Sequence, residues 1–168
     1  MYAALHPGYG TGPMKLSDIL TLERIDTHLH ATDKSAVLHA LSKLIALEAE
    51  NVSAPAQATI ERVLDEREKL ASTGIGDGVA IPHGRVAGLD HFVAALAIRA
   101  EGVPFDAIDG RPASIFFAVV GPEKAAGEHL KCLARIGRVL RDDGVRSRLL
   151  TAAGPADALA IVTGADVP

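Results

Sequence analysis

The stretch FVAALAIRAEGVPFDAIDGRPASIFFAVV, residues 92–120, is the part of the chain that best predicts the fold class. Residues 92–98 form a run of small apolar side chains, which predicts a buried strand. Two further runs, residues 103–108 and 113–120, flank Asp109-Gly110, a dipeptide suited to a tight hairpin turn. Pro112 follows directly and weakens only the first pairing position. We therefore expect a sheet built around this segment.

Helical patterns lie on both sides of the strand-rich segment. Thr32 can cap a helix whose apolar residues recur at helical spacing, and Ser53 and Pro55 are typical of the start of a second helix. Three more helices are predicted over residues 128–140, 145–150 and 156–162. This order of elements predicts an α/β domain of three layers, α/β/α, with a mixed β-sheet flanked by helices.

Length and composition limit the possible classes of protein. The 168 residues fit one domain, and we expect a flexible glycine- and proline-rich tail at residues 1–13 before a single domain over 14–168. The single cysteine, Cys132, excludes an internal disulfide. With 21 acidic and 17 basic residues, the chain lacks the basic character of a nucleic-acid-binding protein. Neither a membrane span nor a signal peptide is present in the sequence, so we expect a cytoplasmic protein without membrane insertion.

A glycine-rich segment, STGIGDGVAIPHGR at residues 72–85, surrounds a short apolar run that predicts a strand over 79–81. No Gly-Lys-Ser/Thr follows, so it is not the phosphate loop of nucleotide hydrolases. Nor is it a dinucleotide-binding fingerprint, because position 79 is valine and the glycines precede their strand. The segment is either a tight connection between helix and strand or a set of backbone amides beside a bulky anion.

Three polar residues stand out against this framework. His83 follows the strand predicted over 79–81 and lies between Pro82 and Gly84, which gives it a fixed backbone and an open approach. His129 lies on the apolar face of its predicted helix, close to the start of that helix. Arg67 falls on the apolar stripe of the second helix, where the period favours a hydrophobic residue. We expect the three side chains to converge on one cleft of an open α/β sheet.

Two histidines and an arginine are suited to phosphoryl transfer. A neutral imidazole, with an ordinary pKa of about 6.5, is a good nucleophile near physiological pH. Arg67 would bind phosphate oxygens through its planar, permanently charged fork, and His129 could hydrogen-bond a phosphate oxygen or help to balance its charge. A donor that is itself a phosphorylated protein makes an ATP site unnecessary, so we expect no cofactor and no metal ion.

The sequence resembles enzyme IIA of the bacterial phosphoenolpyruvate-dependent phosphotransferase system, in its fructose/mannitol branch and most closely in its nitrogen-regulatory members. The stretches that carry the resemblance are REKLASTGIGDGVAIPHG at residues 67–84, FDAID at 105–109 and EHL at 128–130. The resemblance implies a mixed sheet between helices. It also implies that His83 accepts phosphate from an HPr-like carrier, that His129 is a second active-site histidine, and that Arg67 faces the phosphate. Asp77, where many relatives carry asparagine, is placed outside the site.

Three functions remain open. The chain is either a phosphorylation-dependent regulator of a target protein, or a IIA subunit that passes phosphate to a separate sugar permease. The third, of another class, is a metal-dependent hydrolase that uses His28 and His30, which would share one face of a strand. Such hydrolases have (β/α)₈ barrels of about 250 residues. We therefore interpret these two histidines as solvated surface residues. The sequence does not predict the oligomeric state.

Overall fold

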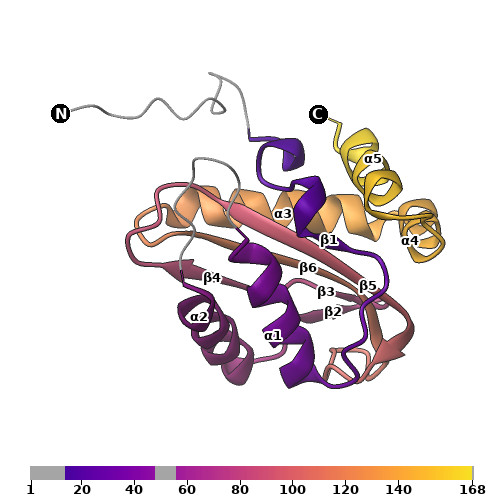
Figure 1. Ribbon diagram of the computed structural model, residues 1–168, viewed down its shortest axis with the longest axis horizontal. Helices are drawn as coiled ribbons and strands as arrows, with labels where there is room; N and C mark the ends of the chain where they lie inside the picture. The colour runs from indigo at the N-terminus through magenta and orange to yellow at the C-terminus, as the bar shows by residue number, and fades with distance from the viewer. Residues whose placement is uncertain (1–13, 48–55, 168) are drawn as a thin grey trace.

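The computed structural model describes residues 14–47 and 56–167. Within these residues, helices cover both faces of a mixed six-stranded sheet (Figure 1). The α-helices are α1 (Lys34–Ile45), α2 (Gln57–Leu70), α3 (Ala126–Arg141), α4 (Asp143–Leu150) and α5 (Pro155–Ala165), and two 3₁₀ turns are η1 (Leu16–Asp18) and η2 (Leu22–Arg24). The strands are β1 (Ile25–Asp26), β2 (Gly74–Gly76), β3 (Val79–Ala80), β4 (His83–Val86), β5 (Val93–Val103) and β6 (Ala113–Pro122). The predicted three-layer α/β/α fold is confirmed.

Strand β6 organises the sheet. It pairs antiparallel with β5 on one side, and on the other side it pairs parallel first with β3 and then with β4. Strand β1 runs parallel to β5, and β2 runs antiparallel to β3. Among the described strands, β4 pairs only with β6, with His83 opposite Val119 and Arg85 opposite Gly121. Strand β4 is therefore an edge of the sheet.

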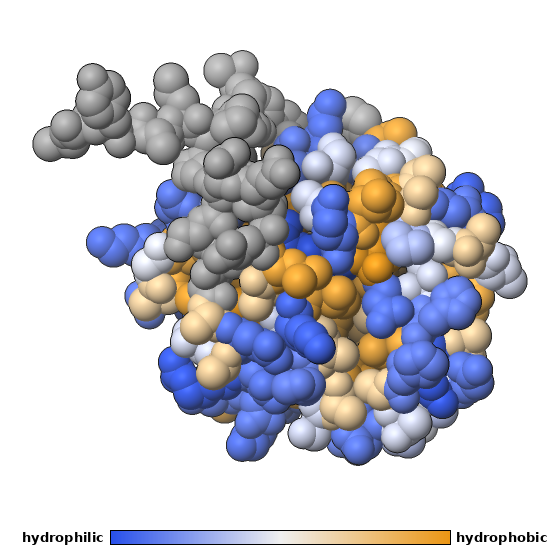
Figure 2. All heavy atoms as spheres, in the orientation of Figure 1, coloured by the Kyte–Doolittle hydropathy of each residue, from blue (hydrophilic) through white to orange (hydrophobic). Residues whose placement is uncertain are grey.

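The side chains of β6 alternate between the two faces of the sheet, as the period of a strand requires. Phe117 and Val119 join the core beneath α3, α4 and α5. Phe116 and Ala118 join the core beneath α1 and α2. Hydrophilic side chains cover much of the outer surface of α1 and α2 (Figure 2). No helix in the described ranges is both long enough and apolar enough to cross a membrane.

The hairpin differs from the predicted one. Strand β5 runs on to Val103 and pairs with β6, and residues 104–112 connect the two, so the strand predicted over 103–108 is wrong. Pro104 cannot donate to a ladder, and Asp106 has a φ of 53°, which no strand accommodates. Asp109 and Gly110 do lie in a turn, but this turn falls inside the connection.

The start of α1 and the buried face of α2 differ from the predicted ones. Asp33, not Thr32, caps α1, and its Oδ1 accepts a hydrogen bond from the backbone N–H of Ala36 at 2.8 Å. Leu70 is 82% exposed, whereas Glu68 is buried one turn beyond Leu64 on the inner face of α2. The tail at residues 1–13, and Ser53 and Pro55 of the predicted helix start, lie outside the described residues.

Candidate active site

A cleft of about 780 Å³ opens at the β4 edge of the sheet, between α2 and α3. Because these two helices cover opposite faces of the sheet, they can meet only where the sheet ends. The cleft brings together the three residues singled out from the sequence: Arg67 from α2, His83 from β4 and His129 from α3. Residues far apart in the chain thus line one concave surface.

A glycine in β4 allows α2 to lie against the strand. A Cβ atom on Gly84 would lie 2.2 Å from Cγ1 of Val63, far inside van der Waals contact. Val63 precedes Arg67 by one helical turn, so its close approach brings the last turn of α2 beside His83. The glycine next to the histidine is therefore required by helix–strand packing, and it also sets the position of Arg67.

His83 is the first residue of β4, whereas the sequence predicted it at the end of the preceding strand; Ile81 and Pro82 separate β3 from β4. Its Nδ1 lies 2.7 Å from the carbonyl oxygen of Ile81. Because a carbonyl oxygen can only accept, Nδ1 carries the proton and donates it, and Nε2 keeps a free lone pair. Burial lowers the pKa of His83, and the nearby charge of Arg67 lowers it further. The imidazole is therefore neutral near pH 7.

His129 lies in the first turn of α3 and is only 7% exposed, which confirms its predicted place on the buried face near the start of its helix. Its ring centroid is 5.6 Å from that of His83 and 6.0 Å from that of Phe92. Among the described residues, no hydrogen-bond partner is present for its Nδ1. Burial lowers the pKa of His129 to about 4, and repulsion from Arg85, and from His83 whenever that ring is protonated, acts in the same direction. A second neutral imidazole thus faces the first.

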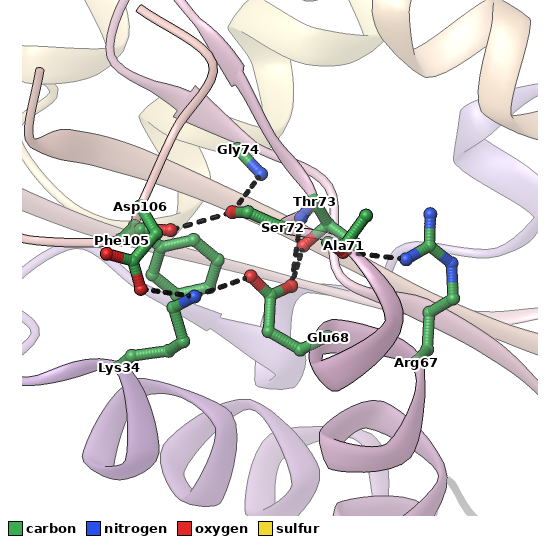
Figure 3. Close-up of polar contacts among 9 residues, drawn as sticks. All are labelled: Lys34, Arg67, Glu68, Ala71, Ser72, Thr73, Gly74, Phe105 and Asp106. Atoms are coloured by element: carbon green, nitrogen blue, oxygen red, sulfur yellow. Dashed lines mark hydrogen bonds and ion pairs between the residues drawn. The ribbon is translucent and has the colours of Figure 1, made fainter. Parts of the chain in front are cut away.

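Two arginines flank the histidines. Nη1 of Arg67 donates to the carbonyl oxygen of Ala71 at 2.8 Å, and its other terminal nitrogen points away from this contact (Figure 3). Nη1 of Arg85 donates to the carbonyl oxygen of Glu123 at 3.3 Å. Sequence reasoning missed Arg85. Since residues two apart in a strand share a face, Arg85 lies on the same side of β4 as His83, and recognising residues 83–86 as a strand would have revealed it.

A second cavity, of about 450 Å³, adjoins the first and is also lined by Arg67 and His83. Asp77 lines this second cavity and is absent from the lining of the cleft. It lies in the turn between β2 and β3, where Asp77 and Gly78 have φ values of 56° and 77°. Two successive positive φ values are typical of a type I′ hairpin turn, which favours aspartate, asparagine and glycine. Turn geometry therefore accounts for the aspartate.

The histidine pair of the hydrolase hypothesis lies elsewhere. Strand β1 ends at Asp26, so His28 and His30 do not share a strand face, and both are exposed. Over residues 14–47 and 56–167, no group of three or more histidine, cysteine, aspartate or glutamate side chains is placed to hold a metal ion. The interpretation of these two histidines as solvated surface residues agrees with their exposure.

Comparison with known proteins identifies the family. The family model described as "Phosphoenolpyruvate-dependent sugar phosphotransferase system, EIIA 2" matches residues 18–164. The chain belongs to this family. This EIIA chain is 38% identical over 136 residues to a nitrogen regulatory protein of Bradyrhizobium diazoefficiens, covering 81% of this chain and 86% of the relative. It is 34% identical over 137 residues to a PTS system fructose-specific EIIA component of Haloferax volcanii, covering 82% and 87%.

Solved structures agree with the sequence relatives. The nitrogen regulatory protein IIA-Ntr of Neisseria meningitidis matches with a TM-score of 0.78 and 37% identity, over 88% of this chain and 99% of that one. Enzyme IIA of the mannitol system of Escherichia coli, in complex with phosphorylated enzyme IIB, matches with a TM-score of 0.68 over 86% and 97%. At 18% identity, the second match shows the shared fold. The family and fold expected from the sequence are confirmed.

Proposed function

We propose that this chain is a cytoplasmic phosphoryl carrier that accepts phosphate on Nε2 of His83 from an HPr-like phosphocarrier and regulates a target protein through its phosphorylation state. The observation that carries the proposal is the hydrogen bond from Nδ1 of His83 to the carbonyl of Ile81, at the edge of a cleft that holds two arginines. This bond leaves a nucleophilic nitrogen free. The family supplies the reaction class, which is phosphoryl transfer in the phosphoenolpyruvate-dependent system.

The transfer step exchanges one P–N bond for another. The lone pair on Nε2 of His83 attacks the phosphorus of the donor's phosphohistidine, and the donor imidazole leaves with the electron pair of the broken bond. The positive charge that develops on the His83 ring is stabilised by the Ile81 carbonyl, which accepts from Nδ1–H. No base is needed, because the attacking nitrogen carries no proton.

Charges around the cleft suit the transferring group. The planar guanidinium of Arg67 would bind two phosphate oxygens, and Arg85 would add a second cation to the same cleft. The neutral ring of His129 would donate one hydrogen bond to a phosphate oxygen. Such donors, held in place before the reaction, stabilise the charge spread over a phosphoryl transition state. We assign His83 and His129 as the catalytic residues and Arg67 as the phosphate-binding residue, with Arg85 in support.

The regulatory role is supported by the nitrogen regulatory proteins that match nearly full length. Phosphorylation of His83 adds charge and acceptor oxygens to an exposed cleft, which is sufficient to create or abolish an interface. The single cysteine of the chain does not serve as a second carrier, because Cys132 is buried and burial raises its pKa to about 12. Cys132 is therefore not the group that receives the phosphate from His83.

A second candidate is phosphate delivery to a sugar permease. It is favoured by the match to a fructose-specific EIIA component, and by the mannitol IIA that shares this fold and was solved with phosphorylated enzyme IIB. The cleft chemistry is the same in both candidates. They differ only in the protein that receives the phosphate.

Labelling with phosphoenolpyruvate tests the shared chemistry. The chain is mixed with phosphoenolpyruvate, the first enzyme of the relay and an HPr-like carrier, and we expect one acid-labile phosphoryl group by mass spectrometry. The His83→Ala variant should acquire none, whereas His28→Ala should label as the parent does. A His83→Ala variant that labels normally would refute the proposal. Adding a candidate permease and its sugar separates the two roles, because only the transport role yields sugar phosphate.

A further inference from the structure

We propose that Glu68 is a positioning residue for the transfer at His83: paired with Lys34, it anchors the turn at residues 71–73, and this turn orients both the His83 imidazole and the Arg67 guanidinium. The inference rests on the proposed function, since it concerns the same reaction. It assigns a role to a buried carboxylate and its partly exposed lysine partner, on the far side of α2 from the cleft, which the transfer chemistry itself does not use.

Glu68 is a buried carboxylate whose Oε2 is hydrogen-bonded, whereas among the described residues Oε1 has an ion pair with Lys34 and no hydrogen-bond partner. Its side chain is 3% exposed, and Oε2 accepts hydrogen bonds from the backbone N–H of Thr73 at 2.9 Å and from the Thr73 hydroxyl at 2.5 Å. Its other oxygen, Oε1, lies 2.9 Å from Nζ of Lys34 (Figure 3). A buried charge is tolerated only with such compensation. The position of Thr73 is thereby tied to that of Glu68.

From Thr73, two more hydrogen bonds reach the nucleophile. The Thr73 carbonyl accepts from the backbone N–H of Ile81 at 3.0 Å, and the Ile81 carbonyl accepts from Nδ1–H of His83 at 2.7 Å. The Ile81 carbonyl, which selects the tautomer of His83, therefore belongs to a residue that is hydrogen-bonded to Thr73, and Thr73 is in turn hydrogen-bonded to Glu68. The carboxylate also acts through space, because Glu68 opposes the effect of burial and raises the pKa of His83.

The same turn holds the arginine. Arg67 precedes Glu68 in the chain and donates to the Ala71 carbonyl at 2.8 Å (Figure 3). Two successive residues of α2 thus form hydrogen bonds with the turn, Arg67 at Ala71 and Glu68 at Thr73. A shift of the turn would move the attacking imidazole and the phosphate-binding cation together. Misplacement of reacting groups by about 1 Å can slow a reaction about 100-fold.

Two further contacts brace the ion pair from outside. Lys34, at the start of α1, also lies 2.9 Å from Oδ2 of Asp106 and 5.0 Å from the centroid of the Phe105 ring. The hydroxyl of Ser72 donates to the Phe105 carbonyl at 2.7 Å. The turn is therefore held between α2 and the connection at residues 104–112. Figure 3 shows Lys34 reaching from α1 to both carboxylates.

Glu68→Gln tests the inference, because a glutamine keeps the shape and removes the charge. Its amide can direct an oxygen to Thr73 only by directing its NH₂ group at Lys34, so one of the two contacts is lost. We expect phosphoryl transfer to slow at least about tenfold. By ¹⁵N NMR, the His83 ring, held as the Nδ1–H form in the parent, should become a mixture of tautomers. The double variant Lys34→Met/Glu68→Gln should recover most of the transfer rate and most of the Nδ1–H tautomer of His83, because the glutamine amide no longer faces a cation.

Asp166 offers a matched control. It is a buried carboxylate that also accepts from a backbone N–H, that of Leu16 at 2.7 Å, and from an arginine, Nε of Arg135 at 2.5 Å. We expect Asp166→Asn to lower the melting temperature while the transfer rate and the His83 tautomer stay as in the parent. If Glu68→Gln does not fold, Lys34→Met, whose lysine is partly exposed, should shift the tautomer in the same direction and slow transfer about threefold.

The two proposals fail in different ways. The NMR measurement needs no phosphoryl donor. If the parent protein acquires no phosphate in the phosphoenolpyruvate assay, the proposed function is overturned, and the effect of Glu68→Gln on the His83 tautomer can still be measured. Parent-like rate and tautomer in a folded Glu68 variant would overturn the positioning role. So would equal slowing by Glu68→Gln and Asp166→Asn, because the effect would then follow stability alone.

Discussion

Near each of two edge strands, β1 and β4, lies a pair of histidines, and only the pair near β4 lines the cleft described above. His28 and His30 follow the end of β1, are two residues apart in sequence and are exposed. At the β4 edge, His83 and His129 come from different elements and face each other at 5.6 Å. Burial lowers the pKa of both rings, and arginines stand beside them. Proximity in sequence is therefore a weaker sign of a site than convergence of elements at a sheet edge.

The sharpest test of this contrast is to remove one histidine from each edge. We expect His129→Ala to slow phosphorylation of the chain about 100-fold, because a donor held ready for the transition state is lost. The matched change at the other edge, His28→Ala, should leave the rate unchanged. Both are measured as initial rates of labelling, with melting temperatures to verify folding. A folded His129→Ala variant with the parent rate would remove His129 from the site.

A smaller effect is expected for Arg67→Lys, about tenfold on the same rate. The ammonium keeps the charge but cannot make the two parallel contacts of a guanidinium. Arg62→Lys is the matched control, since Arg62 lies on the same helix, exposed and paired with Glu66 at 3.4 Å. If Arg67→Lys transfers as fast as Arg62→Lys, bidentate binding by Arg67 is wrong.

The free energy of unfolding of the chain should depend on pH through the histidines at the β4 edge. The pKa of His129 is lowered to about 4 in the folded chain, whereas the unfolded chain binds this proton near pH 6.5. Between these values the unfolded state holds more protons, so the free energy of unfolding should fall by on the order of 1 kcal/mol for each pH unit as the pH drops from 6.5. Denaturant unfolding at pH 6.5, 6.0 and 5.5 measures this slope.

The control for that slope is His129→Phe, which fills the space without a titrating group. It should retain only the part due to His83, whose pKa is lowered in the same direction. An unchanged slope in His129→Phe would mean that the buried ring takes up its proton as readily as an exposed one.

The smallest expected effect is that of Arg85→Ser, about threefold on the transfer rate. Arg85 lines the cleft but is exposed, whereas Arg67 is half-buried, so solvent weakens the interaction of Arg85 with the phosphate more. Arg111→Ser, which removes an exposed arginine outside the cleft, provides the comparison. Equal rates for the two variants would show that net charge, and not the place of Arg85, matters.

Much of the framework could be predicted from local patterns. The apolar runs that became β5 and β6 follow from composition, and the periodicity of α3 placed His129 on a buried face near its helix start. Arg67 was visible as a charge on an apolar stripe. These features are set by neighbours within a few residues, which is the range over which helical and strand periods act.

Other features depended on residues distant in sequence. Asp109-Gly110 carried a local turn signal, but strand pairing extended β5 to Val103 and moved the hairpin. The helical pattern did not single out Glu68, whose carboxylate is buried because Lys34 and Thr73 compensate it from outside α2. Arg85 was missed because β4 forms only through pairing with β6.

The amino-acid sequence by itself determined three things. These are the layers of helix and strand, the glycine that allows α2 to pack closely against β4, and the chemical types of the reacting side chains. The tertiary structure alone decided which nitrogen of His83 is free, which cations reach it and what holds the turn beneath it. The physical reason is that burial, tautomer and charge compensation are properties of an environment. That environment forms only when the chain folds and the sheet brings α1, α2, α3 and β4 together at one edge.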